Sequence, residues 1–103
     1  MVKIDKTVAR DWLADVPQEK RFWCADGRFL ANLSQLAAAL KDMSDGTFRQ
    51  HTSETKSDFS NWVRDVIGDE KLTKDLQKSK TQAQAAKAVA ERVAWLKGKA
   101  EAG

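Results

Sequence analysis

The amino-acid sequence predicts a mainly α-helical protein, a compact bundle of five to six helices with one short β-hairpin near residues 21–31. Apolar residues recur at intervals of three and four along most of the chain, which is the spacing of helices with one buried face. Residues that cap or end helices separate these stretches. Asp26-Gly27 lies between two aromatic segments and is typical of a tight hairpin turn. A chain of 103 residues has room for one core, so we expect a single domain over residues 1–103.

Composition argues against several classes of protein. The chain is 42% hydrophobic and 32% charged, a balance that suits a folded soluble protein rather than a disordered one. No apolar run approaches the roughly 20 residues needed to span a bilayer. Charges interrupt the N-terminus where a signal peptide needs an apolar stretch. We therefore expect a cytoplasmic protein that does not bind a membrane.

Cysteine and histidine are too scarce for a conventional metal centre. Cys24 is the only cysteine and His51 the only histidine, so no internal disulfide can form and a zinc site has too few ligands. We expect no metal and no cofactor. Cys24 lies between Trp23 and Ala25, which favours burial as a small hydrophobe over a role as nucleophile. The chain also has no glycine-rich phosphate loop, nucleophile elbow or dinucleotide fingerprint.

The first predicted helix runs from Asp5 to Val16. Asp5 or Thr7 can cap its start, and Pro17 closes it because the residue before a proline is pushed out of the helical region. Its apolar side contains Val8, Trp12, Leu13 and Val16.

The predicted hairpin follows. With a two-residue turn at Asp26-Gly27, Cys24 lies opposite Phe29 and Trp23 lies opposite Leu30. One face then holds Phe22, Cys24, Phe29 and Ala31, and the other holds Trp23 and Leu30. One face should cover the helical core, and the other should lie under a terminal helix or meet a partner.

The central element of the chain is a helix predicted over residues 57–69. Ser57 is a good N-cap, Asp58 places a negative charge in the first turn, and Gly68 can take the left-handed conformation that ends a helix. The apolar face contains Phe59, Trp62, Val63, Val66 and Ile67. Asp58, Asn61 and Asp65 form a stripe on the opposite side, which we interpret as a solvated or salt-bridged face.

Four further helices are predicted around it. Asn32 or Ser34 caps a helix that ends near Met43, and Asp69 caps one with Leu72 and Leu76 inward. Between them, Ser44-Asp45-Gly46 ends the first of these helices and can cap a short one through Thr47, Phe48 and His51. Thr81 and Gln84 have the spacing of a capping box and begin the last helix, which Gly98 should end. Its apolar stripe contains Ala85 or Ala86, Val89, Val93 and Leu96.

The positive charge lies in the C-terminal third. Residues 1–70 hold 10 Lys/Arg and 12 Asp/Glu, a net −2, whereas residues 71–103 hold 8 and 3, a net +5. The candidate nucleic-acid contacts are Lys87, Arg92, Lys97 and Lys99. These residues surround the last helix instead of lining one side, which favours a solvated surface over a nucleic-acid groove.

His51 is the first candidate for acid–base chemistry, with Asp58 or Glu54 as its partner. A lone histidine beside a helix start is more often a structural hydrogen-bonding group. We therefore interpret His51 as a link between the helix at 44–52 and the loop before Asp58. An enzyme that uses His51 and Asp58 ranks last among the functional hypotheses.

The four tryptophans divide into two pairs. Trp12 and Trp62 lie on inward faces and are expected in the core. Trp23 and Trp95 lie on the flanks of their elements, where they can anchor a protein interface, cover each other or cover the hairpin. The candidate interaction surface is Trp23, Leu30 and Trp95.

Part of the chain resembles a family of small uncharacterised archaeal and bacterial domains. That family shares a His, a short gap, then Lys-Asn-Asp-Phe, Trp-Ile/Val, Asp-Val and Gly-Asp. The matching residues here are His51, Lys56, Asp58, Phe59, Trp62, Val63, Asp65, Val66, Gly68 and Asp69, with Ser57 at the Asn position. The resemblance covers most of residues 20–97 and implies a prokaryotic domain of unknown function. It carries no activity, so we interpret these motif residues as structural.

The leading hypothesis is a non-catalytic protein-interaction or accessory domain with an unknown protein partner. The alternative is nucleic-acid binding through the basic C-terminal third, which requires affinity that falls steeply with salt.

Overall fold

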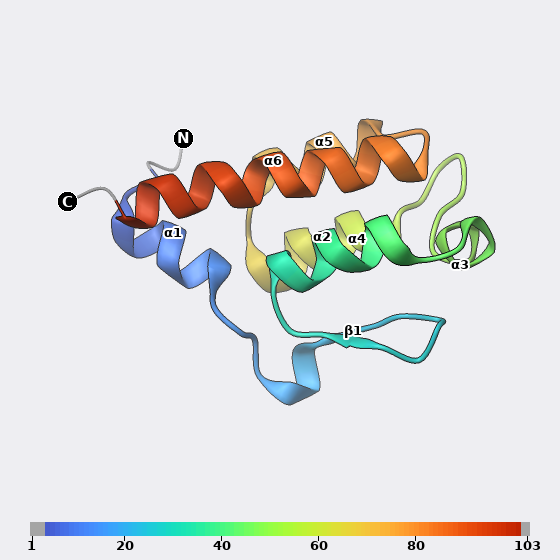
Figure 1. Ribbon diagram of the computed structural model, residues 1–103, viewed down its shortest axis with the longest axis horizontal. Coiled ribbons are helices and arrows are strands. Elements are labelled where there is room, and N and C mark those ends of the chain that lie inside the picture. Colours follow the sequence, from blue (N-terminus) through green and yellow to red (C-terminus); the bar gives the residue numbers. More distant parts are fainter. Residues whose placement is uncertain (1–3, 102–103) are drawn as a thin grey trace.

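The computed structural model describes residues 4–101. Helices dominate this part of the chain and a two-stranded antiparallel sheet accompanies them, so the predicted fold class is confirmed (Figure 1). The α-helices are α1 (Lys6–Leu13), α2 (Leu33–Asp42), α3 (Asp45–Gln50), α4 (Asp58–Trp62), α5 (Glu70–Lys78) and α6 (Gln82–Glu101). The remaining elements are the 3₁₀ turn η1 (Gln18–Lys20), the strands β1 (Phe22–Trp23) and β2 (Phe29–Leu30), and the π-helical segment η2 (Val63–Ile67).

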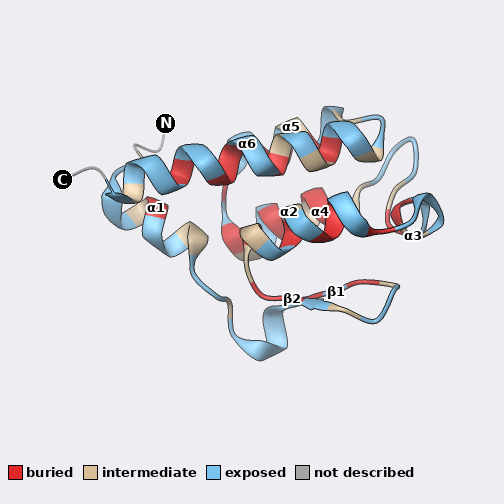
Figure 2. Ribbon diagram, viewed as in Figure 1, coloured by how far each residue is buried: buried red, intermediate tan, exposed pale blue. Residues whose placement is uncertain are grey.

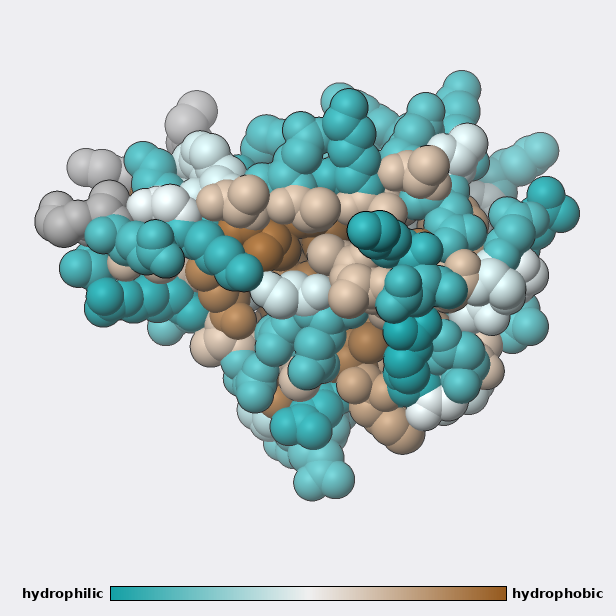
Figure 3. All heavy atoms as spheres, in the orientation of Figure 1, coloured by the Kyte–Doolittle hydropathy of each residue, from teal (hydrophilic) through white to brown (hydrophobic). Residues whose placement is uncertain are grey.

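The core lies where α6 packs against α1, α2 and α5, and where α4 packs against α5. Figure 2 shows buried residues on α2, α4 and α6, while most of the outer surface of α6 is exposed. Hydrophilic side chains cover much of the face seen in Figure 3, and an apolar band is visible beneath α6. The radius of gyration of 13.0 Å matches the value of about 13 Å expected for a folded chain of 100 residues.

Helix α1 begins as predicted and ends early. The Asp5 carboxylate accepts a hydrogen bond from the backbone N–H of Val8 at 2.9 Å and caps the helix. The helix ends at Leu13 instead of Val16, because the chain turns extended at Ala14. The Val16 N–H then donates to the Ala31 carbonyl at 2.8 Å, so a contact with the segment after β2 replaces the last predicted helical turn.

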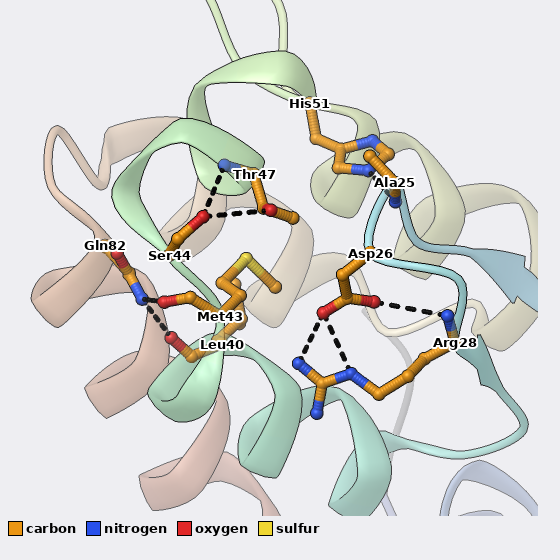
Figure 4. Close-up of polar contacts among 9 residues, drawn as sticks. All are labelled: Ala25, Asp26, Arg28, Leu40, Met43, Ser44, Thr47, His51 and Gln82. Carbon is orange, nitrogen blue, oxygen red and sulfur yellow. Dashed lines mark hydrogen bonds and ion pairs between the residues drawn. The ribbon is translucent and has the colours of Figure 1, made fainter.

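The predicted caps of α2 and α3 are both present. The Asn32 side chain accepts from the Gln35 N–H at 2.8 Å, and Ser44 Oγ accepts from the Thr47 N–H at 3.1 Å. Figure 4 shows the bond between Ser44 and Thr47. The inward side of α2 contains Leu33, Leu36, Ala39 and Leu40, all fully buried.

The central helix is capped and stopped as predicted, but its second half is not α-helical. Ser57 Oγ accepts from the Ser60 N–H at 3.2 Å, and Gly68 takes a left-handed conformation with φ +92°. The Gly68 N–H donates to the Val63 carbonyl at 2.7 Å, five residues back, which is the hydrogen bond of a π-helix. Phe59, Trp62, Val63 and Ile67 are buried as expected, whereas Val66 is only half-buried.

The hairpin has a different register from the predicted one. Phe22 pairs with Leu30 and Trp23 pairs with Phe29. The turn is longer than two residues, because the Gly27 N–H donates to the Cys24 carbonyl at 2.9 Å and the Cys24 N–H donates to the Arg28 carbonyl at 2.8 Å. Gly27 has φ +97°, as in a type I turn followed by a left-handed bulge residue.

Helix α6 is longer than predicted. Its start is capped as expected, since the Gln84 N–H donates to Thr81 Oγ1 at 3.1 Å. Gln82 also donates to the carbonyls of Leu40 and Met43, which joins the start of α6 to the end of α2 (Figure 4). The prediction that Gly98 ends the helix is wrong, because α6 continues through it to Glu101. No helix within residues 4–101 has the length and apolar character needed to cross a lipid bilayer.

Candidate interaction surfaces

The inner face of the hairpin is held on the core by aromatic contacts. Phe22 stacks on Phe59 with ring centroids 5.1 Å apart, and its ring edge meets Trp62 at 6.0 Å. The Trp62 indole N–H donates to the Lys20 carbonyl at 2.8 Å, so α4 also holds the segment before β1. Cys24 is fully buried on the same side. The hairpin is therefore part of the core on one face.

His51 fixes the turn of the hairpin to the helices. Its ring is buried, and Nε2 accepts a hydrogen bond from the Ala25 N–H at 3.0 Å (Figure 4). Since Nε2 accepts, the ring proton resides on Nδ1, which donates to Asp58 Oδ2 at 3.1 Å. Lys56 Nζ lies 3.3 Å from the other oxygen of Asp58. His51 thus joins the end of α3, the start of α4 and the hairpin turn.

This arrangement is poorly suited to catalysis. Both nitrogens of the His51 ring are occupied by structural partners, so neither is free to take a proton from a nucleophile. Burial raises the pKa of the Cys24 thiol, which keeps it protonated and unreactive near neutral pH. No cluster of three or more His, Cys, Asp or Glu residues within residues 4–101 is placed to hold a metal ion.

An ion pair stiffens the hairpin turn. Arg28 donates to Asp26 Oδ2 through Nε at 2.9 Å and through Nη2 at 2.6 Å, as Figure 4 shows. These hydrogen bonds from Arg28 lower the pKa of Asp26 to about 2.

The outer face of the hairpin presents two aromatic rings. Trp23 is 57% exposed and Phe29 is 64% exposed, and the two residues are paired across the strands. Leu30, which the sequence assigned to this surface, is only 3% exposed because the altered register turns it inward. Phe29 takes its place. An Asp-Gly pair is compatible with a two-residue turn and with a three-residue turn that ends in a left-handed glycine, so this pair alone did not distinguish the two registers.

Trp95 belongs to a different surface. It is 43% exposed on α6, with the Arg92 guanidinium carbon 4.5 Å and Lys99 Nζ 5.4 Å from its ring centroid. Figure 1 shows α2 and α4 between α6 and the hairpin. Trp23 and Trp95 therefore do not form one patch. Trp12 is half-buried rather than fully in the core, with its ring centroid 6.0 Å from the Arg92 guanidinium carbon.

Arg92 is not an exposed cation. Its side chain is 8% exposed, and its Nε and Nη2 donate to the two Asp69 oxygens at 2.7 and 3.0 Å. Asp69 is fully buried and also caps α5 by accepting from the Leu72 N–H at 3.2 Å. Arg92 is therefore removed from the candidate nucleic-acid contacts, whereas Lys87, Lys97 and Lys99 are exposed. Sequence reasoning missed this pair, because its partners are 23 residues apart and no local pattern links them.

The other motif residues have local structural roles. Phe59 is buried and Gly68 provides the left-handed stop. Asp65 is exposed beside Arg64, whose Nε lies 2.9 Å from its Oδ1. Ser60 was not singled out in the sequence, yet it is buried and donates from Oγ to the Thr73 carbonyl at 3.0 Å, which joins α4 to α5.

Comparison of the chain with protein-family models, with curated proteins and with solved structures gives no match. The resemblance to a family of small prokaryotic domains therefore stays a prediction.

Proposed function

We propose that this protein is a non-catalytic interaction domain that binds a partner protein through the outer face of its hairpin. The observation that carries the proposal is the exposed cross-strand pair Trp23 and Phe29. Aromatic side chains, tryptophan above all, are enriched among the residues that contribute most to protein binding. A partner that fits this face has an apolar pocket or groove wide enough for two adjacent rings.

The base of the hairpin supports this role. The inner face is fixed by Phe22 on Phe59, and the turn is fixed by the bond from Ala25 to His51. A binding surface that is rigid before binding loses less conformational entropy when the partner arrives. Trp23 and Phe29 are therefore presented on a prearranged support.

The two rings are anchors rather than a whole interface. A large aromatic side chain buries about 150–250 Å² when fully covered, so covering the exposed parts of both rings removes on the order of 250 Å² from water. A stable interface buries about 800 Å² on each partner. We therefore expect either a transient contact or a larger interface with this pair at its centre.

The test is capture of partners from lysate of the source organism on the immobilised protein, with and without nuclease. Three proteins are compared: the wild type, the double variant Trp23→Ala/Phe29→Ala, and Trp95→Ala as a matched loss of an exposed aromatic ring elsewhere. We expect one discrete protein to stay bound to the wild type and to Trp95→Ala after nuclease, and to be lost from the double variant.

Two outcomes would contradict the proposal. Equal capture of the same protein by the double variant would show that the hairpin is not the binding surface. Capture that disappears with nuclease and falls steeply with salt would favour the nucleic-acid alternative. In that case Lys87→Gln, Lys97→Gln and Lys99→Gln should abolish retention.

A further inference from the structure

A second surface lies on the other side of the molecule from the hairpin's aromatic pair. Helices α5 and α6 border a groove of about 1110 Å³, with Ile4 and Trp12 from the N-terminal segment also lining it. This volume lies at the upper end of the range of about 300–1,000 Å³ that is usual for small-molecule sites. The groove is therefore large enough to hold a segment of protein.

The two helices line the groove with regularly spaced residues. On α6 the lining residues include Gln84, Lys87, Ala88, Glu91 and Trp95. Their spacing of three and four places them on one side of that helix. On α5 the lining includes the similarly spaced Lys71, Lys74 and Lys78. A valley between two adjacent helices, with alanine and tryptophan on its floor and long polar side chains on its rims, is the shape that accepts a third helix.

The charge on the rims is not balanced. Lys71 Nζ lies 2.7 Å from Asp75 Oδ2, and Lys74 Nζ lies 3.8 Å from Glu70 Oε1. These four lining charges are therefore paired within α5. Lys78 and Lys87 make no ion pair within residues 4–101, and they stand on opposite helices. Glu91 is the one lining carboxylate that likewise makes no ion pair within residues 4–101. Two unpaired lysines and one unpaired glutamate leave the lining with a small positive excess, which favours an occupant that is more acidic than basic.

Arg92 supports the tryptophan ring that lines the groove. Its Nε and Nη2 donate to the two Asp69 oxygens, which holds the guanidinium in place. Its guanidinium carbon lies 4.5 Å from the centroid of the Trp95 ring, a cation–π contact. The side chain is only 8% exposed, so Arg92 acts on an occupant of the groove through the position of Trp95.

We propose that the groove between α5 and α6 binds an acidic amphipathic helix of another protein. The apolar stripe of that helix packs on Trp12, Ala88 and Trp95. Its flanking Asp or Glu residues meet Lys78 on one rim and Lys87 on the other. This surface is independent of the hairpin face in the proposed function.

The test is a displayed library of amphipathic helices with a fixed apolar stripe and flanking positions randomised among Glu, Lys, Gln and Ser. The target is the full chain carrying Trp23→Ala/Phe29→Ala, so that the hairpin surface contributes nothing to selection. We expect enrichment of helices with Glu at the flanks. Enrichment of lysine flanks, or failure to enrich any helix, would overturn the proposal and would leave the hairpin proposal untouched.

The selected peptide is then measured against groove variants by calorimetry. Lys78→Glu/Lys87→Glu should weaken binding by about fivefold or more, and Trp95→Ala should weaken it by about tenfold. Lys78→Gln/Lys87→Gln should give a smaller loss in the same direction. This glutamine variant also places no acidic charge at the C-terminal end of α5, where a negative charge would destabilise the helix.

The matched control is Lys41→Glu/Lys97→Glu, which makes the same change in net charge at two exposed lysines outside the groove lining. Binding should stay within about twofold of the parent, because charges outside a contact act only through the general field. An equal loss in the control and in Lys78→Glu/Lys87→Glu would show that the peptide responds to net charge and not to the groove.

Discussion

Replacing Asp69 by asparagine tests how much of the fold depends on one buried ion pair. Asn at this position keeps the shape of the side chain and an oxygen that can still accept from the Leu72 N–H. It removes the negative charge that faces Arg92 Nε at 2.7 Å. The guanidinium of Arg92 is then left in the core beside a neutral amide.

The expected cost follows from the burial of both partners. Asp69 is fully buried and Arg92 is 8% exposed, so solvent cannot replace the lost charge. Removing one partner of such a pair typically costs about 3–5 kcal/mol. We expect about 3 kcal/mol for Asp69→Asn, because one neutral hydrogen bond can remain. Asp69→Ala should lose about 1 kcal/mol more, because it also removes the cap of α5.

A loss of this size is a large part of the stability of a small domain, which is typically about 5–15 kcal/mol. The melting temperature should fall by about 12–24 °C for Asp69→Asn, at about 4–8 °C per kcal/mol for a domain of this size. The assay is urea unfolding followed by tryptophan fluorescence and circular dichroism, with the free energy taken at equal denaturant slope.

Asp65→Asn is the matched control, since it removes an exposed carboxylate four residues earlier whose partner is Arg64. We expect no measurable change in its unfolding midpoint. The double variant Asp69→Asn/Arg92→Met should recover part of the loss, because no unpaired charge remains buried. Equal midpoints for Asp69→Asn and Asp65→Asn would refute the reasoning, as would a double variant less stable than Asp69→Asn alone.

Four further predictions concern the hairpin and α6. His51→Ala should lower the free energy of unfolding by about 2–4 kcal/mol, because it removes two hydrogen bonds and a buried ring. In the wild type, ¹⁵N NMR should show a neutral ring with its proton on Nδ1. A proton on Nε2 would contradict the assigned hydrogen bonds. The Cys24 thiol is buried and has a raised pKa, so it should react with an aromatic disulfide far more slowly in the native protein than in urea. His51→Ala should speed the reaction of the native protein. Rapid labelling of the native wild type would show that the hairpin does not cover the Cys24 thiol. An NMR titration should place the pKa of Asp26 at about 2, and Arg28→Gln should raise it toward its usual 3.8. The pKa of Asp26 is lower in the folded than in the unfolded protein. The ion pair between Asp26 and Arg28 therefore stabilises the fold above about pH 4, and this stabilisation is lost as the pH falls through about 2. Gly98→Ala should stabilise the protein by about 0.5–1 kcal/mol, because Gly98 lies inside α6 and an added Cβ meets nothing within 4 Å. A melting temperature of Gly98→Ala below that of the wild type would indicate that α6 ends at Gly98 in solution.

Features that depend on neighbours in the chain could be predicted from the sequence. Ser57, Asn32 and Thr81 cap helices through hydrogen bonds that span three residues, and each was identified from its own surroundings. Apolar spacing placed Phe59 and Trp62 in the core for the same reason. Helical geometry brings residues three and four apart onto one face whatever the rest of the fold does.

The candidate surfaces depended more on contacts between distant segments. A turn longer by one residue reversed the roles of Phe29 and Leu30, since a shift of one position in a strand moves a side chain to the opposite face. The bond from Ala25 to His51 spans 26 residues, and it joins the histidine to the turn of the hairpin. Neither contact has a counterpart in local spacing.

The sequence by itself determined the helical class, the capped starts of the helices and most of the buried positions, because these follow from groups within four residues of one another. Only the tertiary structure decided which aromatic rings face outward, and it alone converted Arg92 from an apparent surface cation into the partner of Asp69. The physical reason is that burial and charge pairing depend on what the rest of the chain places around a residue. Local hydrogen bonding and periodicity are indifferent to that environment.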